Sequence, residues 1–203
     1  MYKKFMLACM AITAFAAFVI APAASAGTLT DNGKPLAAGA SIVGIGTEIS
    51  RFTGGFGVEC EVATLNGTVT QNNTTGPIKG TVPVGGATFT NKGGAACSSA
   101  LGATTVKVTS ELCLEVAVGS DVVKTTGCGG SVVFDLTAAG ITCKYETASV
   151  SGTATTNVDP ATVKVFEQPA NEVGGSFYCP DTGKLDMDFD LYTTDLTTPV
   201  TFT

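Results

Sequence analysis

The sequence predicts an all-β fold, a disulfide-stapled antiparallel β-sandwich or partly open barrel. Short runs rich in Thr and Val alternate apolar with polar residues, which is the period of a half-buried strand. Turn-forming pairs such as Asn32-Gly33 and Gly85-Gly86 separate these runs. Six cysteines follow an N-terminal apolar segment, a count typical of an exported, disulfide-bonded chain.

The first 26 residues are typical of a secretory signal peptide. Lys3 and Lys4 precede an apolar run at residues 5–20, and Ala24-Ser25-Ala26 offers a small-residue cleavage site. An uncleaved anchor is the alternative, but the run is shorter than the ~20 apolar residues that a spanning helix needs. We therefore expect a signal peptide at residues 1–26 and a secreted, single all-β domain at residues 27–203.

Strands are expected wherever this alternation is found. The clearest candidates are residues 58–63, 104–109, 112–118, 131–136, 141–146 and 185–192, and weaker ones are residues 42–45, 87–91, 149–155, 162–166 and 200–202. Asn66-Gly67 between two apolar-polar runs predicts a hairpin turn. A transmembrane barrel is the alternative architecture, but six cysteines and the lack of aromatic girdles argue against it.

The cysteine spacing suggests a duplicated scaffold. Cys60 and Cys97 enclose 36 residues, and Cys143 and Cys179 enclose 35. This spacing suggests pseudo-repeats at about 48–109 and 131–192, joined by a hairpin at 112–130, although matches arise easily in a chain rich in Gly and Thr. The same spacing suggests the pairs Cys60–Cys97 and Cys143–Cys179.

The third pair follows from hairpin geometry. Cys113 and Cys128 are equidistant from a turn centred between Ser120 and Asp121, so a symmetric hairpin places them opposite each other. The other face of this strand should point to the core and consists of Leu112, Leu114, Val116 and Val118. A zinc site is the alternative use of the cysteines. At least 14 residues separate any two of them, which does not fit paired zinc ligands.

The residue types of classical catalysis are missing. The chain has no histidine, and the six cysteines that follow residue 26 are expected to be oxidised, so neither a catalytic triad nor a thiol nucleophile is available. We therefore expect no enzyme, no catalytic residues and no cofactor. A hydrolase that uses two carboxylates is the remaining enzymatic alternative.

One acidic cluster is a candidate metal site. Asp186, Asp188 and Asp190 alternate with apolar residues, so they share one face of a strand and could offer oxygen ligands to calcium. Alternate residues on a strand stand ~6.5–7 Å apart, which is too far for all three to hold one ion without loop ligands. A solvated outer face is the favoured alternative.

The second half of the chain has a distinctive framework of cysteines and glycines. It consists of Leu112-Cys113-Leu114-Glu115, Gly127-Cys128-Gly129-Gly130, Gly140-Ile141-Thr142-Cys143-Lys144-Tyr145-Glu146, Phe177-Tyr178-Cys179-Pro180 and Gly183-Lys184-Leu185-Asp186-Met187. This framework resembles that of a group of secreted, six-cysteine, β-rich proteins of actinobacteria that have no established activity. It implies export and a shared scaffold, and no site residues.

Charge limits the partners. The net charge of −6 becomes −8 once the two lysines of residues 1–26 are removed, and Arg51 is the sole arginine. We therefore expect no nucleic-acid partner and no membrane insertion after signal cleavage.

The leading hypothesis is an exported, non-catalytic protein with a structural or adhesive role, as a component of the cell envelope or extracellular matrix. The alternative is a secreted carrier of a small molecule or of an ion such as calcium. Its pocket would be lined by some of seven phenylalanines, Phe52, Phe56, Phe89, Phe134, Phe166, Phe177 and Phe189.

Overall fold

The computed structural model describes residues 27–54 and 56–203, so the expected signal peptide lies outside the described residues. Within these ranges the chain forms eighteen β-strands and one short 3₁₀ turn, and no helix has the length and apolar character to cross a membrane. The strands are β1 (Leu29–Asp31), β2 (Lys34–Pro35), β3 (Ser41–Gly46), β4 (Ser50–Thr53), β5 (Val58–Cys60), β6 (Val62–Gln71), β7 (Ile78–Val82), β8 (Ala87–Thr90), β9 (Cys97–Ser99), β10 (Gly102–Val108), β11 (Leu112–Val116), β12 (Val122–Gly127), β13 (Val132–Ala138), β14 (Ile141–Thr147), β15 (Val150–Ala154), β16 (Thr162–Gly175), β17 (Thr182–Thr193) and β18 (Val200–Phe202).

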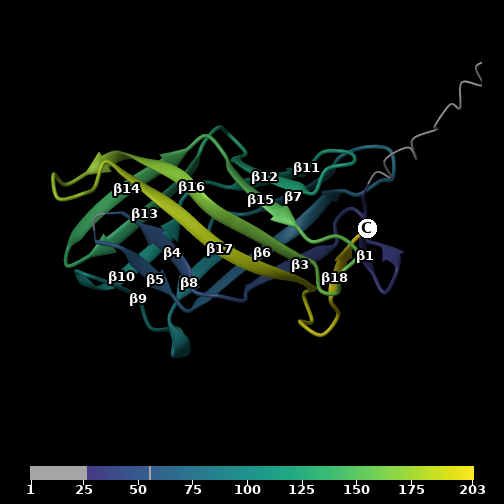
Figure 1. Cartoon of the computed structure of the whole chain (residues 1–203), viewed down its shortest axis with the longest axis horizontal. Helices are drawn as coiled ribbons and strands as arrows, with labels where there is room; N and C mark the ends of the chain where they lie inside the picture. Colours follow the sequence, from purple (N-terminus) through teal and green to yellow (C-terminus); the bar gives the residue numbers. More distant parts are fainter. Residues whose placement is uncertain (1–26, 55) are drawn as a thin grey trace, which may run out of the picture.

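Antiparallel pairing closes the main sheet of the described chain into two circuits of eight strands. The tip circuit runs β17-β4-β5-β9-β10-β13-β14-β16, and the base circuit runs β3-β17-β16-β15-β12-β11-β7-β6. Both contain the long hairpin β16–β17, which runs diagonally across the molecule (Figure 1). The all-β, sandwich-like fold that the sequence predicts is therefore confirmed. Each circuit draws strands from both predicted repeats, and the duplication stays a hypothesis.

The shared hairpin changes partners along its length. Toward its tip β17 pairs with β4, and further along it pairs with β3. Strand β16 also changes its partner, from β15 to β14. The change takes place around a bulge between Val165 and Gln168. Glu167 takes a positive φ of 47° in this bulge, and its N–H donates to Asp186 Oδ1 at 2.7 Å. Such a bulge bends a strand and increases its local twist.

The core is divided in the same way. One cluster of buried side chains fills mainly the tip circuit and includes Phe52, Phe134, Leu136 and Tyr145. A second cluster fills the base circuit beneath the small sheet β18-β1-β2 and includes Phe202. Leu114 packs against both clusters and connects them.

Most strand predictions are confirmed, and the turn predicted at Asn66-Gly67 is wrong. Both residues lie inside β6, which pairs with β3 and β7 on either side. Gly67 serves close packing, because a Cβ there would lie 3.0 Å from the Thr81 carbonyl oxygen. Five strands are not predicted by the sequence, because they are too short or too polar to show a clear alternation: β1, β2, β4, β7 and β9.

The structure contains the disulfides Cys60–Cys97, Cys113–Cys128 and Cys143–Cys179, the three pairs that the sequence suggests. The register expected around the central one is wrong, because Cys113 pairs with Thr126 and Cys128 lies just beyond the end of β12. The shift of two residues keeps the same faces, so the bond is still a surface staple. Leu112, Leu114 and Val116 face inward as expected, whereas Val118 lies two residues beyond the end of β11 and is exposed, so its expected place in the core is wrong.

We expect Gly183→Ala to destabilise the protein by about 1–3 kcal/mol, the usual cost of overpacking a core. A Cβ at Gly183 would overlap the Phe52 ring, which is buried in the tip circuit. Gly44→Ala is the matched control, because a Cβ there meets Leu65 and Phe189 at an ordinary 3.5 Å. Denaturant unfolding of both variants measures the difference, and equal stabilities would contradict this packing.

Candidate functional site

An apolar cavity of about 190 Å³ lies inside the described chain. Its walls come from both core clusters, with Phe52 and Phe134 from the tip circuit and Val69 and Val123 from the base circuit. The cavity therefore extends along the interior shared by the two circuits. A space of this size between two well-formed clusters is unusual, because protein interiors contain few voids larger than a water molecule.

The shape of the cavity follows from the strand that lines it. Leu185, Met187, Phe189 and Leu191, alternate residues of β17, all contribute to its wall. Alternate residues stand ~6.6 Å apart on a strand, so the lined length is ~20 Å. The volume of about 190 Å³ lies along this stretch of β17, so the cavity is elongated in the direction of the strand.

Aromatic and apolar side chains lie at the two ends of this space. Toward the hairpin tip, Phe52 and Phe134 line the cavity, and Tyr145 packs on both with ring-centroid distances of 4.6 and 5.6 Å. Toward the base, Leu29 and Phe202 line it from the paired terminal strands β1 and β18. These strands lie at the opposite end of the long axis from the hairpin tip (Figure 1).

One polar side chain in the cavity wall is both buried and unpaired. Ser50 is 5% exposed, and its Oγ has no hydrogen-bond partner among the described residues. In β4 the residues Ser50 and Phe52 are buried while Arg51 and Thr53 are exposed, so strand alternation points Ser50 inward beside Phe52. The other hydroxyl residues of the wall, Thr68, Thr81 and Thr125, are partly exposed.

The charged residues at the cavity wall direct their side chains to the surface. Arg51 Nε lies 3.0 Å from Glu59 Oε1, and Lys79 Nζ lies 3.2 Å from Glu115 Oε2, with all four side chains about half exposed. These surface ion pairs leave no counter-charge directed into the cavity from the wall residues that the structure describes. An ionised ligand would lose its hydration without compensation there, so the site suits an uncharged one.

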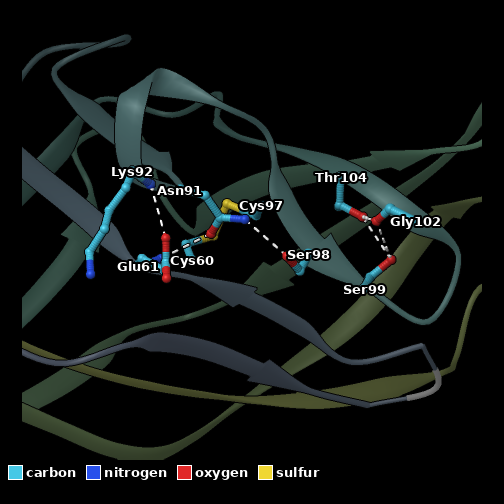
Figure 2. The surroundings of a disulfide bond; sticks show 9 residues. All are labelled: Cys60, Glu61, Asn91, Lys92, Cys97, Ser98, Ser99, Gly102 and Thr104. Carbon is cyan, nitrogen blue, oxygen red and sulfur yellow. Dashed lines mark hydrogen bonds between the residues drawn. A yellow bond between two sulfur atoms is a disulfide. The ribbon is translucent and has the colours of Figure 1, made fainter.

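The Cys60–Cys97 disulfide supports the wall next to Ser50. Cys60 lines the cavity and pairs with Ser50 across β4 and β5. Figure 2 shows how Asn91 links the two segments around this bond. Its Oδ1 accepts from the Glu61 N–H at 3.2 Å, and its Nδ2 donates to Ser98 Oγ at 2.9 Å. The bond and the Asn91 contacts fix β5 against β9, and thus the position of the wall.

The three aspartates share an outer face of β17, and each bonds to a different neighbour. Asp188 forms an ion pair with Lys164 at 3.3 Å, Asp190 accepts from the Thr162 hydroxyl at 2.6 Å, and Asp186 accepts from the Glu167 N–H. Residues 27–54 and 56–203 contain no group of three or more His, Cys, Asp or Glu side chains placed to hold a metal ion. The geometry is that of a solvated strand face with partners on β16.

The seven phenylalanines fall into separate groups. Phe52, Phe89, Phe134 and Phe189 line the cavity. Phe56 is buried near the tip, in a shallow apolar depression that also involves Leu101 and Tyr178. Phe166 and Phe177 are exposed, Phe166 in the bulge and Phe177 in the hairpin tip, so neither of them lines the cavity.

Tyr145 is fully buried and its hydroxyl donates to the Pro180 carbonyl oxygen at 3.0 Å. Burial raises the pKa of Tyr145 to about 12 from its ordinary value of 10.0, and the carboxylates of Glu172 and Asp181 add to this shift. The folded protein thus holds the phenol proton at a pH at which the unfolded chain releases it.

Comparison with models of protein families, with curated proteins and with solved structures gives no match for this chain. The site therefore has to be interpreted from its own geometry. Sequence reasoning missed Ser50, because Ser50-Arg51-Phe52-Thr53 is too short and too polar to predict a strand, and the alternation of buried and exposed residues appears only in the folded chain.

We expect the contribution of Tyr145 to the free energy of unfolding to be constant below about pH 10 and to fall by up to about 2–3 kcal/mol between pH 10 and pH 12, because the unfolded state loses the Tyr145 proton first. Tyr145→Phe lacks this contribution and should show a smaller loss over the same range. Denaturant unfolding at a series of pH values measures both. An identical pH dependence for the two proteins would contradict the burial of the phenol.

We expect Asp188→Asn to change stability by less than about 1 kcal/mol, since its partner Lys164 is largely exposed. Millimolar calcium should leave the melting temperature of the unmodified protein unchanged. Asp121→Asn, at an exposed position away from β17, is the matched control. A calcium-dependent rise in melting temperature that Asp188→Asn alone abolishes would establish the metal site instead.

Proposed function

We propose that this is an exported, non-catalytic protein that binds a small, uncharged, apolar molecule inside its double circuit of strands. The observation that carries the proposal is the apolar cavity of about 190 Å³ lined by both core clusters. The ion pairs of Arg51 and Lys79 on the outer surface add to it, because they leave the cavity without charge.

The size of the cavity limits the ligand. A dry apolar cavity of ~150 Å³ is enough to hold benzene, and drug-sized pockets begin at ~300 Å³. A volume of about 190 Å³ therefore suits a molecule with roughly eight to ten non-hydrogen atoms. The extension of the cavity along β17 favours an unbranched chain over a ring.

Three disulfides in the described chain indicate an oxidising environment. The signal-like segment at residues 1–26 supports secretion. A carrier in this setting needs a scaffold that keeps its cavity without help from chaperones. Closed circuits and disulfides would provide one, since cross-links chiefly destabilise the unfolded chain.

We expect the oxidised protein to bind nonane and nonan-2-one, and Leu114→Phe to weaken both by at least about tenfold. Leu114 lies in the cavity wall and packs against both core clusters, so a larger side chain there fills the space. Val122→Phe adds bulk at an exposed position of β12 and is the matched control. Calorimetry measures binding, and the thermal melt checks folding.

Gly44→Ala is a second variant that tests binding even if Leu114→Phe does not fold. It adds one methyl group to the cavity wall at ordinary contact distances, so folding should be retained while binding weakens. Absence of binding by the unmodified protein, or equal binding by all three variants, would overturn the proposed function.

A structural or adhesive role is the second candidate, and the hairpin tip favours it. Phe177 and Tyr178 are 86% and 63% exposed, and their ring centroids lie 3.8 Å apart. The Cys143–Cys179 disulfide ties this loop to β14, so the two aromatic side chains are presented from an anchored loop. Exposed aromatic residues are typical of interaction surfaces. A protein that binds none of the small apolar probes but is retained on cells through this tip would have the adhesive function.

A further inference from the structure

We infer that the cavity recognises a ligand with an uncharged hydrogen-bonding group in the interior of its chain, and that Ser50 Oγ is the atom that binds this group. The inference rests on the proposed function and names the ligand class: an unbranched aliphatic molecule with an internal carbonyl or hydroxyl group. It stands on the unpaired hydroxyl of a side chain that is 5% exposed and on its place in the cavity wall.

An unpaired buried hydroxyl needs an explanation in energetic terms. Burial of a hydroxyl group without a hydrogen bond costs roughly 1–3 kcal/mol, and native structures contain few such groups. The buried Thr104 shows the usual arrangement, because its hydroxyl donates to Ser99 Oγ at 2.8 Å. Ser50 differs in that its neighbours on the inward face, Phe52 and Cys60, offer no strong acceptor.

The position of Ser50 sets the position of the polar group in the ligand. Arg51 pairs with Asp186 across β4 and β17, so Ser50, one residue further along, lies at the level of Met187. The apolar wall continues on both sides of this level, toward Phe134 at the tip and toward Leu191 and Phe202 at the base. A ligand that fills the cavity therefore reaches Ser50 with an atom inside its chain and places apolar segments in both directions.

The chemistry of the group follows from what surrounds it. A serine hydroxyl can donate to a carbonyl oxygen or exchange donor and acceptor roles with an alcohol. The two cationic side chains at the wall, Arg51 and Lys79, are paired with Glu59 and Glu115 at the surface. A carboxylate or ammonium group in the cavity would remain uncompensated, so the ligand's polar group is neutral.

The test compares nonane, nonan-2-one and nonan-5-one on the oxidised protein and on Ser50→Ala, with dissociation constants from calorimetry. We expect the protein to bind nonan-5-one more tightly than nonan-2-one. Ser50→Ala should weaken nonan-5-one about three- to tenfold, the usual effect of one neutral hydrogen bond, and leave nonane unchanged. Thr53→Ala, an exposed position on the same strand, is the control and should change none of the three.

The unliganded variant gives a second measurement that does not depend on binding. Ser50→Ala removes a buried polar atom that has no partner in the described chain, so its melting temperature should equal or exceed that of the unmodified protein.

The outcomes separate the two proposals. If all three probes bind and Ser50→Ala affects them equally, or if the two ketones bind alike, the role of Ser50 is overturned while the apolar carrier stands. A lower melting temperature for Ser50→Ala would show that its hydroxyl is bonded within the protein and would also overturn it. If none of the probes binds, the proposed function itself fails.

Discussion

The antiparallel pairing of β16 with β17 is the constraint on which the rest of the structure depends. Both circuits contain this hairpin, and each closes only because the hairpin supplies two of its eight strands. The bulge at Phe166 and Glu167 allows the hairpin to take part in both circuits, since it lies where the partner strand of β16 changes. The salt bridge from Lys184 to Glu167, at 3.0 Å, connects the two strands across this bulge.

The closure of the main sheet into two circuits also explains why side chains do not fill the interior completely. A sheet that closes on itself fixes the distance between its walls through its hydrogen bonds, and side chains must then fill whatever space remains. Near the tip, aromatic rings such as Phe52 and Phe134 fill it. The cavity wall also includes glycines, among them Gly44 and Gly152, that add no side chain to the interior. The cavity is therefore a consequence of circuit size combined with small residues.

The sequence predicts local features of this fold better than its closure. Period-two alternation identifies strands such as β13, where Val132, Phe134 and Leu136 are buried in turn. The turn at Asn66-Gly67 fails because the same glycine that favours a turn also permits close strand packing, and only the partner strands decide between the two. The extension of β16 past its bulge depends on pairing with β14, a contact between distant segments that local periodicity does not contain.

The candidate site was hidden from sequence reasoning for the same physical reason. A cavity is what remains after strands from many parts of the chain have closed around it, so no single segment carries its signature. Ser50 illustrates this, because a serine on a four-residue strand has the sequence character of a loop. Only the closure of β4 between β5 and β17 makes it a buried and unpaired hydroxyl. In an otherwise apolar interior, one such group costs stability without improving the packing. We therefore attribute its presence to recognition of a ligand rather than to folding.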